Sequence, residues 1–222
     1  MFLEIDALLS PPEVERLRAL ASASRFVDGR ISNPHNTAKN NLQADVAGGA
    51  QAEPARLMAA ALGRNEELRA WAFPRTMAPP LLAKYVPGMA YGVHGDAAFL
   101  PMGARPIRSD LSCTIFLSDP ETYEGGELAV HLGTRPILFK GRAGSAVVYP
   151  SNTLHEVRPV TGGERLVGLT FMESTVADPA NREVLWQLGE VVALEGATMD
   201  WRNRTTLEWV RESLTRRWTE IG

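Results

Sequence analysis

In the N-terminal part of the chain, hydrophobic residues recur at intervals of three and four, the spacing of one helical face. The first such segment covers residues 14–21, and the Ser-Pro-Pro-Glu sequence at 10–13 before it has the form of a capping box. A second helix is predicted over 54–62, with a glycine as its stop, and a short one after Asn65. The Gly- and Asn-rich stretch 28–41 has no periodicity and predicts a loop.

From about residue 81 the pattern changes to short apolar or alternating segments, which are typical of β-strands. Turn residues such as Pro87-Gly88 and Gly125-Gly126 separate these segments. No stretch between them is long enough for a crossover helix, so we expect a mostly antiparallel sheet closed as a barrel or jelly roll. The predicted strands cover residues 81–86, 89–93, 110–117, 127–132, 136–140, 145–149, 154–157 and 166–172.

Helical spacing returns after residue 178, first over 181–194 and then over 205–218. The predicted fold class is therefore mainly β with flanking helices, around a jelly-roll core. We expect a helical and loop region at 1–78 packed on the core, the β core itself at 79–177, and a C-terminal helical extension at 178–222.

Composition and charge exclude several functional classes. The 222 residues carry 23 Lys and Arg against 26 Asp and Glu, and a net charge of −3 gives no basic surface for bulk nucleic-acid binding. One cysteine excludes an internal disulfide and a Cys-rich zinc module. Neither a signal peptide nor a membrane-spanning run is evident, so a cytoplasmic location is expected. Any metal must be held by carboxylates and by some of the four histidines.

A candidate metal site lies at the end of one predicted strand. His94 and Asp96 are two residues apart, so in an extended segment their side chains point to the same side. His155 begins another predicted strand and completes a set of two histidines and one carboxylate, the facial triad typical of non-haem Fe(II). Arg165 lies on the next strand and suits a carboxylate held bidentately. Taken one at a time, these residues are better explained without a metal: the His-x-Asp pair as a polar strand end, His155 as an ordinary core or surface histidine and Arg165 as a solvated strand-end charge.

Several further motifs occur in order along the chain. Together with the His-x-Asp pair, they make the sequence resemble the iron- and 2-oxoglutarate-dependent dioxygenases, and within them the bacterial PKHD-type hydroxylases, which are named for their similarity to prolyl and lysyl hydroxylases. The combination of Gly-Gly-Glu-Leu and Tyr-Pro-Ser-x-x-Leu-His is the most specific part. The motifs are Lys-Asn-Asn-Leu-Gln at 39–43, Asp-Leu-Ser at 110–112, Phe-Leu-Ser at 116–118, Tyr-Glu-Gly-Gly-Glu-Leu at 123–128, Tyr-Pro-Ser at 149–151, Leu-His at 154–155 and Val-Arg-Pro-Val-Thr at 157–161.

The resemblance implies a double-stranded β-helix core with Fe(II) bound by His94, Asp96 and His155. It further implies that Arg165 binds the 5-carboxylate of 2-oxoglutarate, with help from Tyr85. The implied reaction uses O2, hydroxylates a small-molecule or peptide substrate, and releases succinate and CO2. Ascorbate is implied as a supporting reductant.

The sequence departs from the family pattern next to the proposed ligands. Gly95 stands where the family has a larger apolar residue, and 97–100 is less polar than the resemblance predicts, so substrate selection is expected to differ. Residues 28–41 and 96–109 are the segments expected to select the substrate.

Other candidate residues have simpler structural explanations. His131 is expected to be an ordinary strand residue, His35 a solvated loop residue and Cys113 a small core residue. The five tryptophans lie outside the β block and are expected either to pack helices onto the barrel or to form a contact within a homo-oligomer; they are Trp71, Trp186, Trp201, Trp209 and Trp218.

Two alternatives to an oxygenase remain open at this point. The first is a non-catalytic jelly roll that binds metal or 2-oxoglutarate as a sensor. The second is a cupin-like metalloenzyme, which would be richer in histidine and would not need Arg165.

Overall fold

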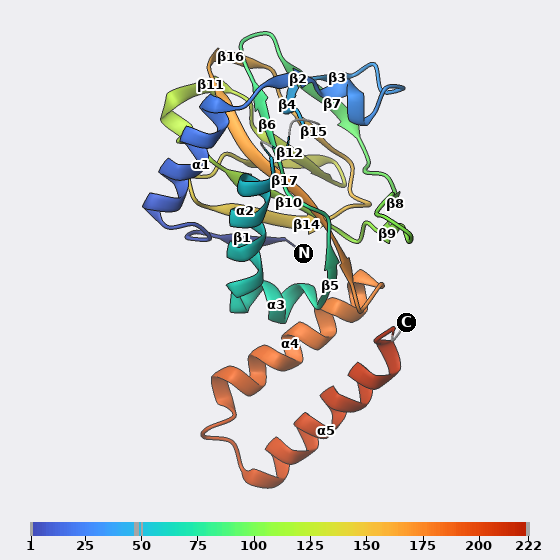
Figure 1. Cartoon of the computed structure of the whole chain (residues 1–222). Helices are drawn as coiled ribbons and strands as arrows, with labels where there is room; N and C mark the ends of the chain where they lie inside the picture. Colours follow the sequence, from blue (N-terminus) through green and yellow to red (C-terminus); the bar gives the residue numbers. More distant parts are fainter. Residues whose placement is uncertain (1, 47–48, 50, 221–222) are drawn as a thin grey trace.

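The computed structural model describes residues 2–46, 49 and 51–220. Within these residues the helices lie before and after a block of short strands (Figure 1). The α-helices are α1 (Pro11–Ala23), α2 (Ala52–Arg64), α3 (Glu66–Ala72), α4 (Pro179–Glu195) and α5 (Trp201–Trp218), and the 3₁₀ turns are η1 (Gly29–Ser32) and η2 (Pro120–Thr122).

Two antiparallel sheets form the core of the described residues. The larger sheet has the order β1 (Leu3–Ile5), β14 (Ala146–Pro150), β10 (Leu111–Phe116), β17 (Arg165–Ser174), β6 (Leu81–Tyr85), β4 (Leu42–Ala44), β2 (Phe26–Asp28), and β5 (Pro74–Met77) also pairs with β17. The smaller sheet has the order β13 (Arg135–Phe139), β12 (Leu128–Leu132), β15 (His155–Val157), β7 (Ala90–His94), β3 (Lys39–Asn40). Two short ribbons pair β11 (Tyr123–Gly125) with β16 (Val160–Gly163), and β8 (Phe99–Leu100) with β9 (Ile107–Arg108). The core is thus the predicted jelly roll.

The alternation along β10 shows how the sequence builds two hydrophobic cores. Leu111, Cys113 and Ile115 belong to the core on the side of the larger sheet that is covered by α1, α2 and α3. Phe116 belongs to the second core, which includes residues of both sheets and fills the space between them. Because side chains alternate across a strand, Ser112 also points into this inner space. The inner space is where the candidate site lies.

The predicted helices and all eight predicted strands are confirmed within a few residues, including helix α1, where Glu13 accepts a hydrogen bond from the backbone N–H of the N-cap Ser10 at 2.8 Å. The stretch predicted as a loop, 28–41, contains η1 and β3. The N-terminal part differs from the prediction, because it also contains strands. β1, β2, β4 and β5 join the larger sheet and β3 joins the smaller one. Three of these five strands are only three residues long and one has two, which is too short for an alternating pattern to show in the sequence.

Helices α4 and α5 form a hairpin that extends from one end of the core (Figure 1). Trp71 is buried in the core and Trp186 packs against that core, which is the first of the two roles expected for the tryptophans. Trp201 and Trp209 are 71% and 66% exposed, so they do not pack onto the barrel. None of the helices in the described residues has the length and apolar character needed to cross a membrane.

Candidate metal centre

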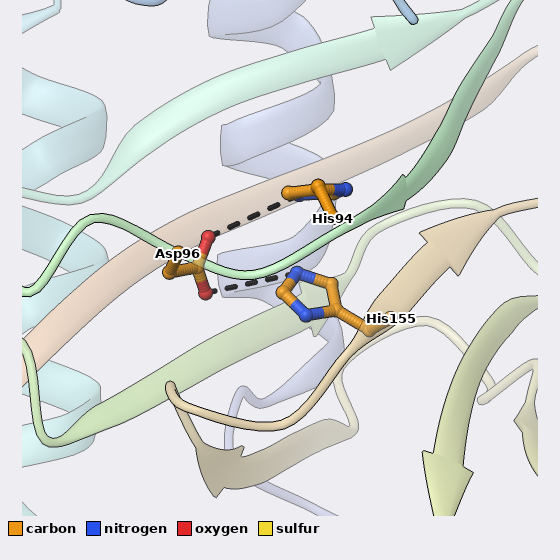
Figure 2. Close-up of side chains that lie close together, drawn as sticks. All are labelled: His94, Asp96 and His155. Carbon is orange, nitrogen blue, oxygen red and sulfur yellow. Dashed lines mark ion pairs between the residues drawn. The ribbon is translucent and has the colours of Figure 1, made fainter.

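Three ligand-type side chains converge where β7 meets β15. His94 is the last residue of β7, His155 is the first of β15, and the two are paired in the sheet register. Asp96 follows β7 directly, and one potential ligand atom from each residue lies within 4.8 Å of the others. Figure 2 shows both imidazoles turned toward the carboxylate. The structure thus brings together the three residues that the sequence analysis selected, although His94 and His155 are 61 positions apart in the sequence.

Backbone carbonyls fix the orientation of both imidazole rings. Nδ1 of His94 lies 2.8 Å from the carbonyl oxygen of Gly92, and Nδ1 of His155 lies 2.9 Å from that of Thr153. A neutral ring therefore carries its proton on Nδ1, where the carbonyl accepts it, and Nε2 keeps a lone pair for a metal. Nε2 of His94 and of His155 lie 4.0 and 3.6 Å from the carboxylate oxygens of Asp96. Burial lowers the pKa of His94, and the charge of the neighbouring His155 lowers it further, so the neutral form is favoured.

A bulge in β7 places Tyr91 beside His94. Between the register pairs His155↔His94 and Val157↔Tyr91, β7 advances three residues while β15 advances two. This extra residue turns Tyr91 and His94 to the same side, and their rings stack with centroids 3.5 Å apart at an angle of 14°. Tyr149 contacts the ring of His155 edge-on at 5.1 Å. Each histidine is therefore held by an aromatic ring as well as by a carbonyl.

A cavity of about 320 Å³ connects the triad with Arg165. Arg165 is 1% exposed, and its Nε and Nη1 have no hydrogen-bond partner among the residues that the structure describes. Tyr85 lies opposite Arg165 in the β6–β17 register, and its ring is 5.1 Å from the guanidinium carbon. A buried cation whose donors are unpaired is costly by itself, so this arrangement suits an anionic ligand that enters the cavity.

The Gly-Gly-Glu-Leu segment packs directly against Arg165. Gly126 has a φ of +68°, and a Cβ there would lie 3.1 Å from Cδ of Arg165 and 3.1 Å from the ring of Tyr123. Only glycine accommodates both the backbone conformation and this close approach. The hydroxyl of Tyr123 is buried and makes no hydrogen bond of normal geometry within the described ranges. Burial raises its pKa, and the neighbouring Arg165 guanidinium opposes this rise. Tyr123 is thus a polar neighbour of Arg165 to which the sequence gave no separate role.

The other candidate residues lie elsewhere. His131 lies on β12 with Nε2 3.4 Å from a carboxylate oxygen of Glu156, and His35 is exposed. Cys113 is 1% exposed, as expected for a core residue.

Both segments expected to select a substrate do contribute to the cavity wall, through Ser32, Asn33 and Lys39 on one side and Ala97 and Leu100 on the other. Lys39 donates a hydrogen bond to Ser32 at 2.6 Å.

Comparison with known proteins identifies the family. Residues 80–173 match the 2OG-Fe(II) oxygenase superfamily model. The chain is 47% identical to a PKHD-type hydroxylase of Sphingopyxis alaskensis, over 95% of this chain and 96% of the relative. It is 37% identical to one of Thermosynechococcus vestitus over the full length of both.

The fold is similar to that of two solved structures. A prolyl-4-hydroxylase of Pseudomonas putida has 20% identity and a TM-score of 0.52, over 78% of this chain and 92% of that one. A prolyl hydroxylase of Trichoplax adhaerens has 16% identity and a TM-score of 0.55, over 78% and 83%. Since close relatives share its full length, the chain belongs to the PKHD-type hydroxylases, a group of 2-oxoglutarate-dependent oxidoreductases within the 2OG-Fe(II) oxygenase superfamily.

Proposed function

We propose that this chain hydroxylates a peptidyl or small-molecule substrate in a reaction that converts 2-oxoglutarate and O2 to succinate and CO2. In this proposal His94, Asp96 and His155 bind Fe(II), and Arg165 with Tyr85 binds the 5-carboxylate of 2-oxoglutarate. The observation that carries the proposal is the presence of both halves of the site in one cavity: a converging His-Asp-His triad and a buried arginine with unpaired donors.

The donor set fits Fe(II). Two neutral imidazole nitrogens and one carboxylate form the facial arrangement that suits non-haem Fe(II) and leaves neighbouring positions open. Fe(II) bound there supplies the redox chemistry with O2 and the 2-oxo acid that protein side chains lack. The protein contributes position: carbonyls of Gly92 and Thr153 hold the rings, and Ser112 donates a hydrogen bond to Asp96. These contacts keep the ligands in place before the metal arrives.

Arg165 supplies orientation and charge for the cosubstrate. Its planar guanidinium can donate two parallel hydrogen bonds to one carboxylate. Tyr85 supports the guanidinium with its ring face. Because Arg165 is buried, these hydrogen bonds form away from competing water, so binding at the far carboxylate sets the position of the 2-oxo acid relative to the triad.

The substrate is proposed to enter beside residues 28–41 and 96–109, where the cavity is lined by Asn33, Lys39 and Leu100. A peptide is supported by the name of the fold relative from Pseudomonas putida, a prolyl-4-hydroxylase, and by the Trichoplax adhaerens enzyme in complex with a peptide fragment. A small molecule is the other substrate class in the proposal. Ascorbate is proposed only as a reductant that keeps the iron ferrous.

The test is succinate formation from 2-oxoglutarate by purified protein with Fe(II), O2 and ascorbate, with and without a panel of prolyl and lysyl peptides and small molecules. Wild type should release succinate above background, and His94→Ala should reduce the release to background. His131→Ala, which removes an imidazole outside the triad, should retain it. Equal background release by wild type and His94→Ala would refute catalysis. Binding of Fe(II) and 2-oxoglutarate without turnover would instead support the sensor alternative.

A further inference from the structure

Three buried serines lie behind Asp96. Apart from the hydrogen bond from Ser112 to Asp96, they have no part in the proposed function. Ser112 Oγ donates to Oδ2 of Asp96 at 2.5 Å. Ser112 Oγ lies 2.8 Å from Ser151 Oγ, and Ser109 Oγ donates to Ser151 Oγ at 2.9 Å. The three are 3%, 2% and 8% exposed in the order Ser112, Ser151, Ser109. Two of them end the Asp-Leu-Ser and Tyr-Pro-Ser motifs.

The direction of these hydrogen bonds follows from the number of protons. A serine hydroxyl has one proton to donate and can accept two hydrogen bonds. Ser112 uses its proton on Asp96, so Ser151 must donate to Ser112, and Ser109 donates to Ser151. All three hydroxyl dipoles therefore point toward Oδ2 of Asp96, and such a chain strengthens each of its bonds by polarisation.

The backbone around the serines is tied to the same segment. The Ser151 amide donates to the carbonyl of Asp110 at 3.0 Å, and the Asp96 amide approaches the carbonyl of Ser151 at 3.4 Å. The Ser109 amide donates to Ala98 at 2.9 Å. The loop that carries Asp96 is therefore bound to the same backbone as the hydroxyls, which leaves the chain of hydroxyls little freedom to shift away from the carboxylate.

We propose that Ser109, Ser151 and Ser112 form a positioning chain that fixes the Asp96 carboxylate in the orientation in which its two oxygens face Nε2 of His94 and Nε2 of His155. This inference rests on the proposed metal site. Oδ2 carries the Ser112 hydrogen bond, whereas no hydrogen bond to Oδ1 comes from any residue in the described part of the chain. Without the Ser112 hydrogen bond, the carboxylate can rotate out of this orientation, so metal binding weakens and the metal is no longer fixed in position for 2-oxoglutarate.

The experiment measures Mn(II) binding by electron paramagnetic resonance, without 2-oxoglutarate and then during its titration at saturating Mn(II). Ser112→Ala should weaken Mn(II) binding by about 10- to 100-fold, the usual effect of losing a partner of a metal ligand. Ser151→Ala should have a smaller effect and Ser109→Ala the smallest, because each is one bond further from Asp96. Ser112→Ala should also weaken 2-oxoglutarate binding to the Mn(II)-loaded protein.

Two further variants separate positioning from packing. Ser112→Thr keeps the hydroxyl and should bind Mn(II) within a few-fold of wild type. Ser145→Ala removes a serine that is as buried as Ser109, at 8% exposure. Ser145 donates to the Arg142 carbonyl at 2.7 Å and not toward Asp96, so its loss should leave Mn(II) binding unchanged. Thermal melting of each variant reports whether it folds.

Distinct outcomes overturn the inference and the function on which it rests. A folded Ser112→Ala protein that binds Mn(II) as tightly as wild type would overturn the positioning chain and leave the metal site intact. If Ser112→Ala does not fold, the other variants decide. The positioning chain would be overturned if Ser151→Ala and Ser109→Ala bind Mn(II) as tightly as the control Ser145→Ala. A wild-type protein that binds no Mn(II) would overturn the metal site itself.

Discussion

Replacing Arg165 by methionine should separate stability from cosubstrate binding. The side chain is 1% exposed, and two of its donor nitrogens, Nε and Nη1, have no hydrogen-bond partner among the described residues. Methionine is long, unbranched and adaptable, so it fills much of the same space without a charge or a donor. The substitution should therefore stabilise the ligand-free protein while it removes the contact proposed for 2-oxoglutarate.

The gain in stability can be estimated from the contacts of Arg165. Each buried, unpaired donor costs about 1–3 kcal/mol, so two cost about 2–6 kcal/mol. The contact of the guanidinium with the Tyr85 ring, at 5.1 Å, stabilises the folded protein by about 1–2 kcal/mol, and methionine cannot make this contact. The net gain in the free energy of unfolding is about 0–5 kcal/mol. For a chain of this length, each kcal/mol raises the melting temperature by about 2–4 °C.

The loss of affinity follows from the same nitrogens. Two hydrogen bonds from a charged donor contribute about 1.5–3 kcal/mol each, so binding of 2-oxoglutarate should weaken by about 3–6 kcal/mol. At about 1.4 kcal/mol per tenfold, this is a factor of about 10² to 10⁴. Ligand that binds the folded state raises its melting temperature, and this rise should disappear in Arg165→Met.

Differential scanning fluorimetry with and without 2-oxoglutarate and Mn(II) measures both effects. Arg135→Met is the matched control, because Arg135 is exposed on β13; its stability should change by less than about 0.5 kcal/mol and its response to 2-oxoglutarate should persist. A less stable ligand-free Arg165→Met protein would refute the energetic reasoning. A normal response of that variant to 2-oxoglutarate would refute the assigned role.

Two further predictions concern the core. Burial raises the pKa of the Cys113 thiol to about 12, so folded protein at pH 8 should not react with a thiol reagent until denaturant is added; rapid stoichiometric labelling of native protein would contradict this. Gly168→Ala should lower the free energy of unfolding by about 1–3 kcal/mol, since a Cβ at this position would lie 2.2 Å from the Met58 sulfur. Urea denaturation measures this loss, and combining the change with Met58→Ala should recover part of it if the clash is the cause.

The sequence predicted much of the fold because the controlling signals are local. Short apolar runs between turn residues, such as 111–116 and 146–150, mark the strands, and the two-residue period of a strand sends successive side chains into the two cores alternately. The short strands β1 to β4 were missed for the opposite reason. Two or three residues carry no readable period. These segments become strands by pairing with an edge that the tertiary structure offers: β1 with β14, β3 with β7, β4 with β6 and β2 with β4.

The sequence by itself determined which residues compose the candidate site, since order and residue type selected His94, Asp96, His155 and Arg165. Tertiary structure alone decided how they are held. The bulge that stacks Tyr91 on His94 and the hydroxyl chain that ends on Asp96 both depend on the register between strands far apart in sequence. Register is a property of pairing and not of either segment, so no local pattern encodes it.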